Sequence, residues 1–186
     1  FYPDYFGKNF VLNDLTHDGG LTAIRIEGPK NAVDHRMDRL SKELGLLDQE
    51  LSVLDNEQSN IFWSRTKNLE VFKSLESNLL RIVVPISETL QVIQKFKNYE
   101  TKYFIDWGGS LIWTSFDQLN TKILNEIKDI VKKHQGYTTL IKVEEDLKAS
   151  ADIFTIDPIK YKISEKIKRS FDPKRIFNPG KMYTGI

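Results

Sequence analysis

The chain has 186 residues, 40% of them hydrophobic and 28% charged, and this ordinary globular composition argues against disorder. Its 27 lysine and arginine residues nearly balance 26 aspartate and glutamate residues, so the net charge of +1 argues against a protein-wide field for nucleic acid or membrane surfaces. The absence of cysteine excludes disulfides, thiolate zinc sites, iron–sulfur clusters and a cysteine nucleophile in this chain.

The start of the chain, Phe1 to Phe6, is rich in aromatic residues and lacks the basic and apolar regions of a signal peptide. It has no initiating methionine, so we expect a piece of a longer protein, with a processed N-terminus as the alternative. No apolar run approaches the ~20 residues that a membrane helix needs. These features predict a cytoplasmic chain.

The first half of the chain predicts an alternation of strands and helices. Residues 17–20 (His-Asp-Gly-Gly) predict a turn, because Asp-Gly and Gly-Gly tolerate positive φ. Apolar residues at spacings of four and three between Asn31 and Leu44 predict an amphipathic helix with Gly45 as its C-cap. The expected elements are a strand at 21–27, a helix at 31–44, a short strand at 50–54 and a helix at 60–72. We expect these strands to join the sheet of the second half.

The second half has a clearer pattern, in which helical and strand periodicities alternate. Gly108-Gly109 lies between two apolar runs and predicts a hairpin. The expected elements are a strand at 79–85, a helix at 87–96 capped by Ser87, hairpin strands at 102–107 and 110–114, a helix at 116–134 capped by Gly136, and a strand at 137–143. This β-α-β-β-α-β order is ferredoxin-like, so we predict an α+β fold with helices on one face of an antiparallel sheet.

The C-terminal stretch differs from the rest in charge and in pattern. Ile159, Ile163 and Ile167 recur at a spacing of four and predict a short amphipathic helix. The segment from Phe171 to Tyr183 has no periodicity and contains two proline-anchored turns. Residues 156–186 hold 8 basic and 3 acidic residues, a net charge of +5, which leaves −4 for the rest of the chain.

A self-contained active site is not visible in the sequence. The three histidines, His17, His35 and His134, form no metal-binding pair, and the structural interpretation of each is favoured. Motifs for a hydrolase elbow or a phosphate loop are absent, and the carboxylates are scattered beside lysine and arginine. We predict no metal site.

Three segments stand out as candidates for binding. In the first, at 104–113, Trp107 and Trp113 lie on either side of Gly108-Gly109, which indicates either aromatic packing in a hairpin or a close approach of backbone to a flat ligand. The second, at 136–139, joins a helix to a strand and carries three hydroxyls. The third, at 171–183, is a rigid irregular segment of the kind that positions another group.

The order and spacing of these segments resemble a known family. FDPKRIFNPGKMY at the end resembles the closing signature of FAD-linked oxidases of the vanillyl-alcohol oxidase type. FIDWGGSLIW, together with LTAIRIEG, NIFWSRTKN and LLRIVVP, is similar to the C-terminal part of the FAD-binding E subunits of glycolate oxidases. The resemblance extends from about residue 10 to the end.

This resemblance implies a domain organisation for the chain. In the family, an N-terminal domain outside these residues binds most of the FAD. Residues 1–20 would then connect to that domain, 21–155 would form an α+β cap, and 156–186 would return towards the FAD domain. The resemblance also implies a set of residues near the flavin, namely Asn178, Pro179, Gly180, Tyr183, Trp107, Gly108 and Gly109.

One departure from the family concerns the substrate site. Relatives commonly have a histidine and an arginine after the glycine of the second segment, whereas this chain has Tyr137 and Leu140. Tyr137 could donate a hydrogen bond, but an unperturbed pKa of about 10 makes tyrosine a poor base near neutrality. A substrate carboxylate would therefore need another cation, and Arg25 and Arg81 are the candidates. No catalytic residue is assigned.

The leading hypothesis is the cap portion of an FAD-dependent oxidoreductase that oxidises a small 2-hydroxy acid such as glycolate by hydride transfer to the flavin. The resemblance implies other oxidase subunits as partners, through which the chain could associate with a membrane, and implies that these residues alone are inactive. The rival hypothesis is a non-catalytic ferredoxin-like module left after loss of the FAD domain. RNA binding is disfavoured because the strands lack the aromatic pattern of RNA-binding sheets.

Overall fold

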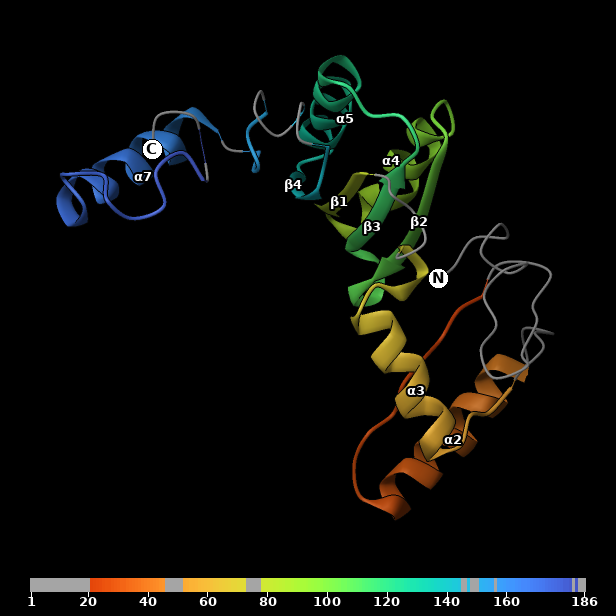
Figure 1. Ribbon diagram of the computed structural model, residues 1–186. Helices are drawn as coiled ribbons and strands as arrows, with labels where there is room; N and C mark the ends of the chain where they lie inside the picture. The colour runs from red at the N-terminus through yellow and green to blue at the C-terminus, as the bar shows by residue number, and fades with distance from the viewer. Residues whose placement is uncertain are drawn as a thin grey trace. The chain divides into compact units, whose positions relative to one another are not determined.

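The computed structural model describes residues 21–45, 52–72, 78–144, 147, 151–155, 157–181 and 183 (Figure 1). The described residues divide into two compact units, one within 21–72 and the other within 78–183. We call the described parts of 21–72 the first unit and those of 78–183 the second unit. The turn predicted at 17–20 and the connecting segment expected at 1–20 lie outside the described residues.

The first unit consists of the helices α2 (Lys30–Gly45) and α3 (Asn56–Lys67), followed by the short η1 turn (Glu70–Phe72). The helix predicted at 31–44 is confirmed as α2. Helix α3 begins earlier than predicted because Asp55 caps it. The Asp55 carboxylate accepts the Gln58 N–H at 2.8 Å, and the Gln58 side chain accepts the Asp55 N–H at 3.1 Å.

The strand predictions in the first unit are wrong over its described residues. Leu21 forms an isolated bridge, residues 22–27 have no strand structure, and neither have residues 52–54. The physical reason at 21–27 is a break in the alternation, since Ala23 and Ile24 are adjacent and no single face is continuously apolar. Ile24 is accordingly exposed. The sheet contains only strands of the second unit.

The second unit contains a four-stranded antiparallel sheet in the order β2-β3-β1-β4. Its elements are β1 (Asn78–Val83), η2 (Ile86–Glu88), α4 (Thr89–Phe96), β2 (Thr101–Asp106), η3 (Trp107–Gly109), β3 (Leu111–Phe116), α5 (Thr121–Lys133) and β4 (Tyr137–Lys142). This is the ferredoxin-like arrangement, so the predicted α+β fold is confirmed.

Helices α4 and α5 pack on one face of this sheet and form the hydrophobic core with it (Figure 1). Alternate residues of the strands point into the core, among them Leu80, Ile82, Ile112, Phe116 and Leu140. The Phe116 ring makes edge contacts with Phe96 of α4 and with Tyr99, at centroid distances of 5.7 and 6.1 Å.

Three predicted helix boundaries are wrong for local reasons. Phe116 belongs to β3, and α5 starts at Thr121 because the Asn120 side chain accepts the Ile123 N–H at 2.9 Å. Ser87 lies in η2 and makes no cap, since Glu88 occupies the N-cap position of α4 without a side-chain bond. After α5, Gln135 rather than Gly136 takes the left-handed conformation, with φ 58°.

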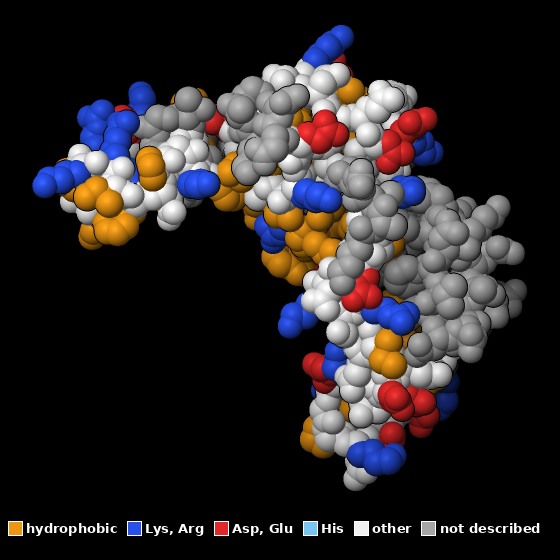
Figure 2. All heavy atoms as spheres, in the orientation of Figure 1, with side chains coloured by type: hydrophobic (Ala, Val, Ile, Leu, Met, Phe, Trp, Pro, Cys, Tyr) orange, Lys and Arg blue, Asp and Glu red, His pale blue; other side chains and the backbone are white. Residues whose placement is uncertain are grey.

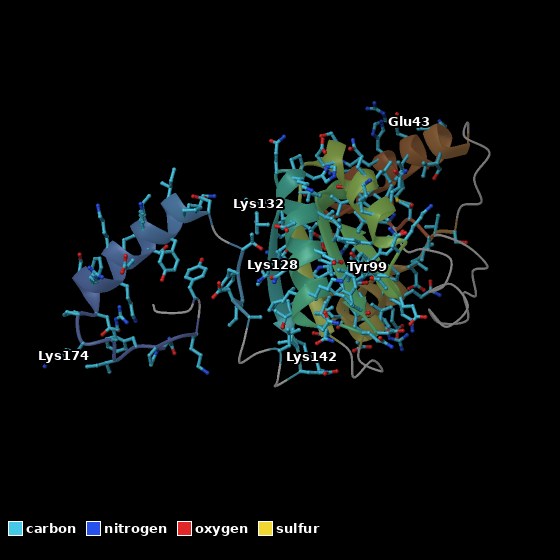
Figure 3. The ribbon with its side chains drawn as sticks, turned by 90° about the horizontal axis from the view of Figure 1, so that it is seen from above. Glu43, Tyr99, Lys128, Lys132, Lys142 and Lys174 are labelled. Carbon is cyan, nitrogen blue, oxygen red and sulfur yellow. The ribbon has the colours of Figure 1, made fainter. Side chains whose placement is uncertain are left out.

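The end of the second unit contains helix α7 (Pro158–Phe171), capped by Asp157, whose carboxylate accepts two backbone N–H groups. The predicted stripe of Ile159, Ile163 and Ile167 lies on this helix and is exposed. The ammonium of Lys128 in α5 (labelled in Figure 3) donates at 2.8 Å to the carbonyl of Asp152, which lies in the segment before α7. Among the described helices, none combines the length and apolar character required to cross a bilayer.

Candidate functional site

The turn between β2 and β3 holds three consecutive residues in the left-handed region. The φ angles of Trp107, Gly108 and Gly109 are 52°, 61° and 116°. Glycine adopts such angles freely, whereas for a bulky residue this conformation costs roughly 1–2 kcal/mol of conformational energy. The two glycines are therefore explained by backbone conformation, and Trp107 is strained.

Side chains at both ends of this turn hold it in place. The Asp106 carboxylate accepts the Trp107 N–H at 2.7 Å, and the Ser110 hydroxyl donates to the Trp107 carbonyl at 3.1 Å. The Thr89 hydroxyl, from the start of α4, donates to the Gly109 carbonyl. These bonds fix the backbone of the turn that carries the exposed Trp107 indole.

Arg81 lies over this indole. Its guanidinium carbon is 4.9 Å from the centroid of the Trp107 ring, which is cation–π geometry. Arg81 is on β1, a central strand, where its register partners are Trp113 of β3 and Thr139 of β4. Within the described parts of the chain, the Arg81 guanidinium has no ion pair and no hydrogen bond.

We call the sheet face opposite α4 and α5 the Arg81 face. Register and strand alternation place on it Arg81, Val83, Leu111, Trp113, Tyr137 and Thr139. Figure 2 shows hydrophobic side chains gathered over β1, β3 and β4. Leu111 is buried, whereas Tyr137 is 47% and Trp107 is 58% exposed, so the polar and aromatic end of this face is accessible.

Tyr137 is a neighbour of Arg81 across the strand pair. Tyr137 pairs with Val83, and Thr139 pairs with Arg81, so Tyr137 is the diagonal neighbour of Arg81 on the same face. Diagonal neighbours have backbones about 7–8 Å apart, within reach of long side chains. The structure thus brings together Arg81, Trp107 and Tyr137, which the sequence singled out in separate segments.

Arg25, the other predicted cation, belongs to the first unit. Its guanidinium forms an ion pair with Glu27 at 2.7 Å and a hydrogen bond with Asn60 at 3.4 Å. Because those acceptors already occupy it, Arg25 is a weaker candidate than Arg81 for an anion.

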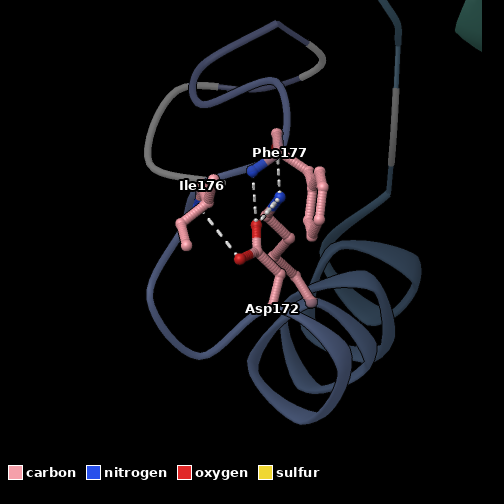
Figure 4. A network of polar contacts seen from close by, with 4 residues as sticks. Asp172, Ile176 and Phe177 are labelled. Atoms are coloured by element: carbon pink, nitrogen blue, oxygen red, sulfur yellow. Dashed lines mark hydrogen bonds and ion pairs between the residues drawn. The ribbon is translucent and has the colours of Figure 1, made fainter.

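The irregular C-terminal segment is organised by Asp172 (Figure 4). The Asp172 carboxylate accepts the N–H groups of Ile176 and Phe177, each at 2.9 Å, and pairs with the Lys168 ammonium at 2.6 Å. The Lys168 ammonium, followed by the two N–H groups, holds the pKa of Asp172 at about 2. One carboxylate therefore shapes this turn.

The residues of this segment that the sequence predicted near a flavin differ in their exposure. Asn178, Pro179 and Gly180 are exposed. Tyr183 is buried, because its ring packs on Phe154 and Tyr161 at centroid distances of 6.0 and 5.9 Å. Burial and the nearby Asp152 raise the pKa of Tyr183.

Sequence reasoning missed the exposed apolar side chains beside this turn. Phe171 is 85%, Ile176 is 67% and Phe177 is 68% exposed, and they extend the isoleucine stripe of α7. The available signal was the presence of large apolar residues between two prolines, where a loop would ordinarily be polar.

The turn at Trp107–Gly109 has space and a flat surface beside it for a planar ligand. A methyl group added to Gly108 would meet nothing within 4 Å, so the turn has open space beside its backbone. The exposed indole of Trp107 adds a flat apolar surface. Among the described residues, no group of three or more histidine or carboxylate side chains could hold a metal ion.

Two comparisons with known proteins give matches. Residues 154–182 match the family model described as FAD linked oxidases, C-terminal domain. The glycolate oxidase subunit GlcE of Escherichia coli (strain K12) is 26% identical over 166 residues, covering 88% of this chain and 39% of that protein. The chain thus spans about two fifths of that relative's length. No solved structure matches the chain. The predicted resemblance to FAD-linked oxidase C-terminal domains is therefore confirmed, and the similarity to the glycolate oxidase subunit is distant.

Proposed function

From its similarity to the C-terminal domains of FAD-linked oxidases, we propose that the chain is the cap portion of an FAD-dependent oxidoreductase. Its substrate is a small 2-hydroxy acid such as glycolate, as the name of the matched relative suggests. FAD is bound mainly by a domain outside these residues, and further oxidase subunits complete the enzyme.

One observation carries this proposal beyond the similarity itself. The segment that matches the family model leaves several large apolar side chains exposed, among them Ile163, Phe171 and Phe177 of α7 and the adjacent turn. The Asp172 hydrogen bonds hold this turn in one conformation. A fixed, exposed apolar surface is typical of a surface that docks on a partner domain.

The chemistry divides between the cofactor and this chain. When bound, the flavin would accept a hydride from the α-carbon of the 2-hydroxy acid. Arg81 would attract the substrate carboxylate, and Tyr137 would donate a hydrogen bond to it. Trp107 and the open backbone of Gly108 would lie against the flavin and exclude water from the substrate.

The test is reconstitution with the FAD-binding domain encoded in the full-length gene. We expect the 186-residue chain alone to be colourless, and the chain with that domain to show a flavin spectrum that glycolate bleaches without oxygen. Stoichiometric FAD on the chain alone would contradict the domain assignment. A complex that binds FAD but is not reduced by glycolate or other 2-hydroxy acids would favour a non-catalytic ferredoxin-like module.

A further inference from the structure

Arg81 is a positive charge in an unusual environment. Strand neighbours on the Arg81 face surround it with Val83, Trp113 and Thr139, and among the described residues no carboxylate pairs with it. Arg81 is only partly exposed, so its guanidinium loses part of its hydration, which is unfavourable without a counter-charge. The nearby Asp106 carboxylate is already bonded to the Trp107 N–H. The Trp107 ring, 4.9 Å from the guanidinium carbon, supplies only a partial negative charge.

We propose that Arg81, supported by Trp107 and flanked by the Tyr137 hydroxyl, forms a binding site for a small carboxylate. The guanidinium presents parallel N–H donors that match the two oxygens of a carboxylate. The indole covers one face of the guanidinium, so the carboxylate binds at its edge. Because this edge carries a single cation, the site neutralises a single carboxylate group.

Trp107 acts as a positioning residue in this site. Its backbone is held in a strained conformation by Asp106 and Ser110, and its partly exposed ring lies 4.9 Å from the Arg81 guanidinium carbon. An arginine side chain has many rotamers, and stacking on a fixed ring reduces the entropy that it loses when an anion binds. Tyr137 is accessible enough to reach the same ligand.

This inference depends on the proposed function only for the identity of the natural ligand. The site itself rests on the geometry of the second unit, so it can be tested without FAD. The probe is glycolate, and the reference compound is glycolamide, which has the same shape without the negative charge. The readout is the shift of the Trp107 indole N–H and the Arg81 Nε–H signals in NMR spectra of the full chain.

We expect saturable shifts with glycolate and none with glycolamide at the same concentration. Arg81→Gln should weaken glycolate binding about tenfold or more, because a charge-assisted bidentate contact is lost. Trp107→Ala should weaken it about two- to fivefold, and Trp107→Phe less, since phenylalanine retains a ring. Arg36→Gln is the matched control, because it removes one exposed arginine of α2 in the first unit and should change nothing.

Equal shifts with glycolamide, or equal weakening by Arg36→Gln and Arg81→Gln, would overturn the proposal. If Arg81→Gln does not fold, Arg81→Lys replaces it. Lysine keeps the positive charge but lacks the paired N–H donors of the guanidinium, so we then expect an intermediate affinity for glycolate. The same variants separate this inference from the proposed function. A reconstituted complex that oxidises glycolate with an unchanged KM in Arg81→Lys refutes the site alone, whereas glycolate binding at Arg81 without flavin reduction refutes the function alone.

Discussion

A methyl group on the Cα of Gly136 would lie 2.4 Å from Cγ1 of Val84, closer than real Cβ contacts. It would also lie 2.6 Å from the Val83 carbonyl oxygen and 2.8 Å from Cγ1 of Val131. Gly136 is thus the point where the chain passes from α5 into β4 against the backbone of β1. The residue is required for space rather than for positive φ.

Gly136→Ala should therefore destabilise the second unit by about 1–3 kcal/mol, since backbone as well as side chains must shift. Denaturant unfolding measures the change. Gly108→Ala is the matched control, because its methyl would meet nothing within 4 Å and only the φ of 61° is unfavourable. We expect about 1 kcal/mol for that control. A larger loss at Gly108 than at Gly136 would contradict this account.

Phe116→Ala tests whether the helix-covered face is the core. Phe116 is fully buried between Phe96 and Tyr99, so its removal should cost about 3–5 kcal/mol in the free energy of unfolding. Leu90→Ala on α4 provides the comparison, because Leu90 is 69% exposed and should change stability by no more than ~0.5 kcal/mol. Similar losses for the two variants would argue against this packing.

Acid should release the Asp172 turn at unusually low pH. The pKa of Asp172 is lowered from 3.8 to about 2 by Lys168 and by the N–H groups of Ile176 and Phe177. A lowered folded-state pKa means that the stabilisation is complete above the unfolded pKa and is lost as the pH falls through about 2. Amide protection of Ile176 and Phe177 should therefore persist at pH 4, fall as the pH passes through about 2 and be lost below it.

Asp172→Asn is the control for this titration. An amide can still accept one backbone N–H, but it loses the charge that pairs with Lys168. We expect weaker protection of both amides and no change in protection between pH 4 and pH 2. Protection that falls with pH in the same way in both proteins would show that another group titrates.

Phe171→Ser tests the docking surface separately from folding. Phe171 is 85% exposed, so the free energy of unfolding should change by no more than ~0.5 kcal/mol. If α7 and its turn contact the FAD-binding domain, the same substitution should weaken the complex, as measured by calorimetry. Lys174→Gln is the comparison for a charged residue of the same segment, and it should weaken the complex less. Unchanged affinity in Phe171→Ser would remove this surface from the interface.

The sheet and its two covering helices could be predicted because their apolar residues recur with clear periods. Ile82 and Ile112 lie on strands in which alternate residues enter the core, and Leu124, Ile127 and Val131 lie on one face of a helix. The strand predicted at 21–27 failed because its alternation is interrupted at Ala23 and Ile24. Asn120 and Asp55 fixed helix starts that periodicity alone placed several residues away.

The candidate site could be predicted as separate residues but not as an arrangement. Arg81, Trp107 and Tyr137 come from three segments, and only the register of β1 with β3 and β4 places them together. The left-handed conformation of Trp107 is unusual for a bulky residue, so residue type did not predict it, although the bonds that hold it come from the nearby Asp106 and Ser110. The exposure of Ile176 and Phe177 depends likewise on Asp172.

The contact of Tyr183 with Phe154 joins the first residue of the segment that matches the family model to the residue that follows its end. The ion pair of Lys168 with Asp172 links α7 to the turn that follows it, so contacts form both within the segment and between its ends. Its turn is held by contacts within the segment, while Phe154 also forms a bridge with Thr139 of β4. A segment with this property can be grafted between relatives as a block, and a chimera that carries residues 154–183 of this chain would inherit the turn together with its docking side chains.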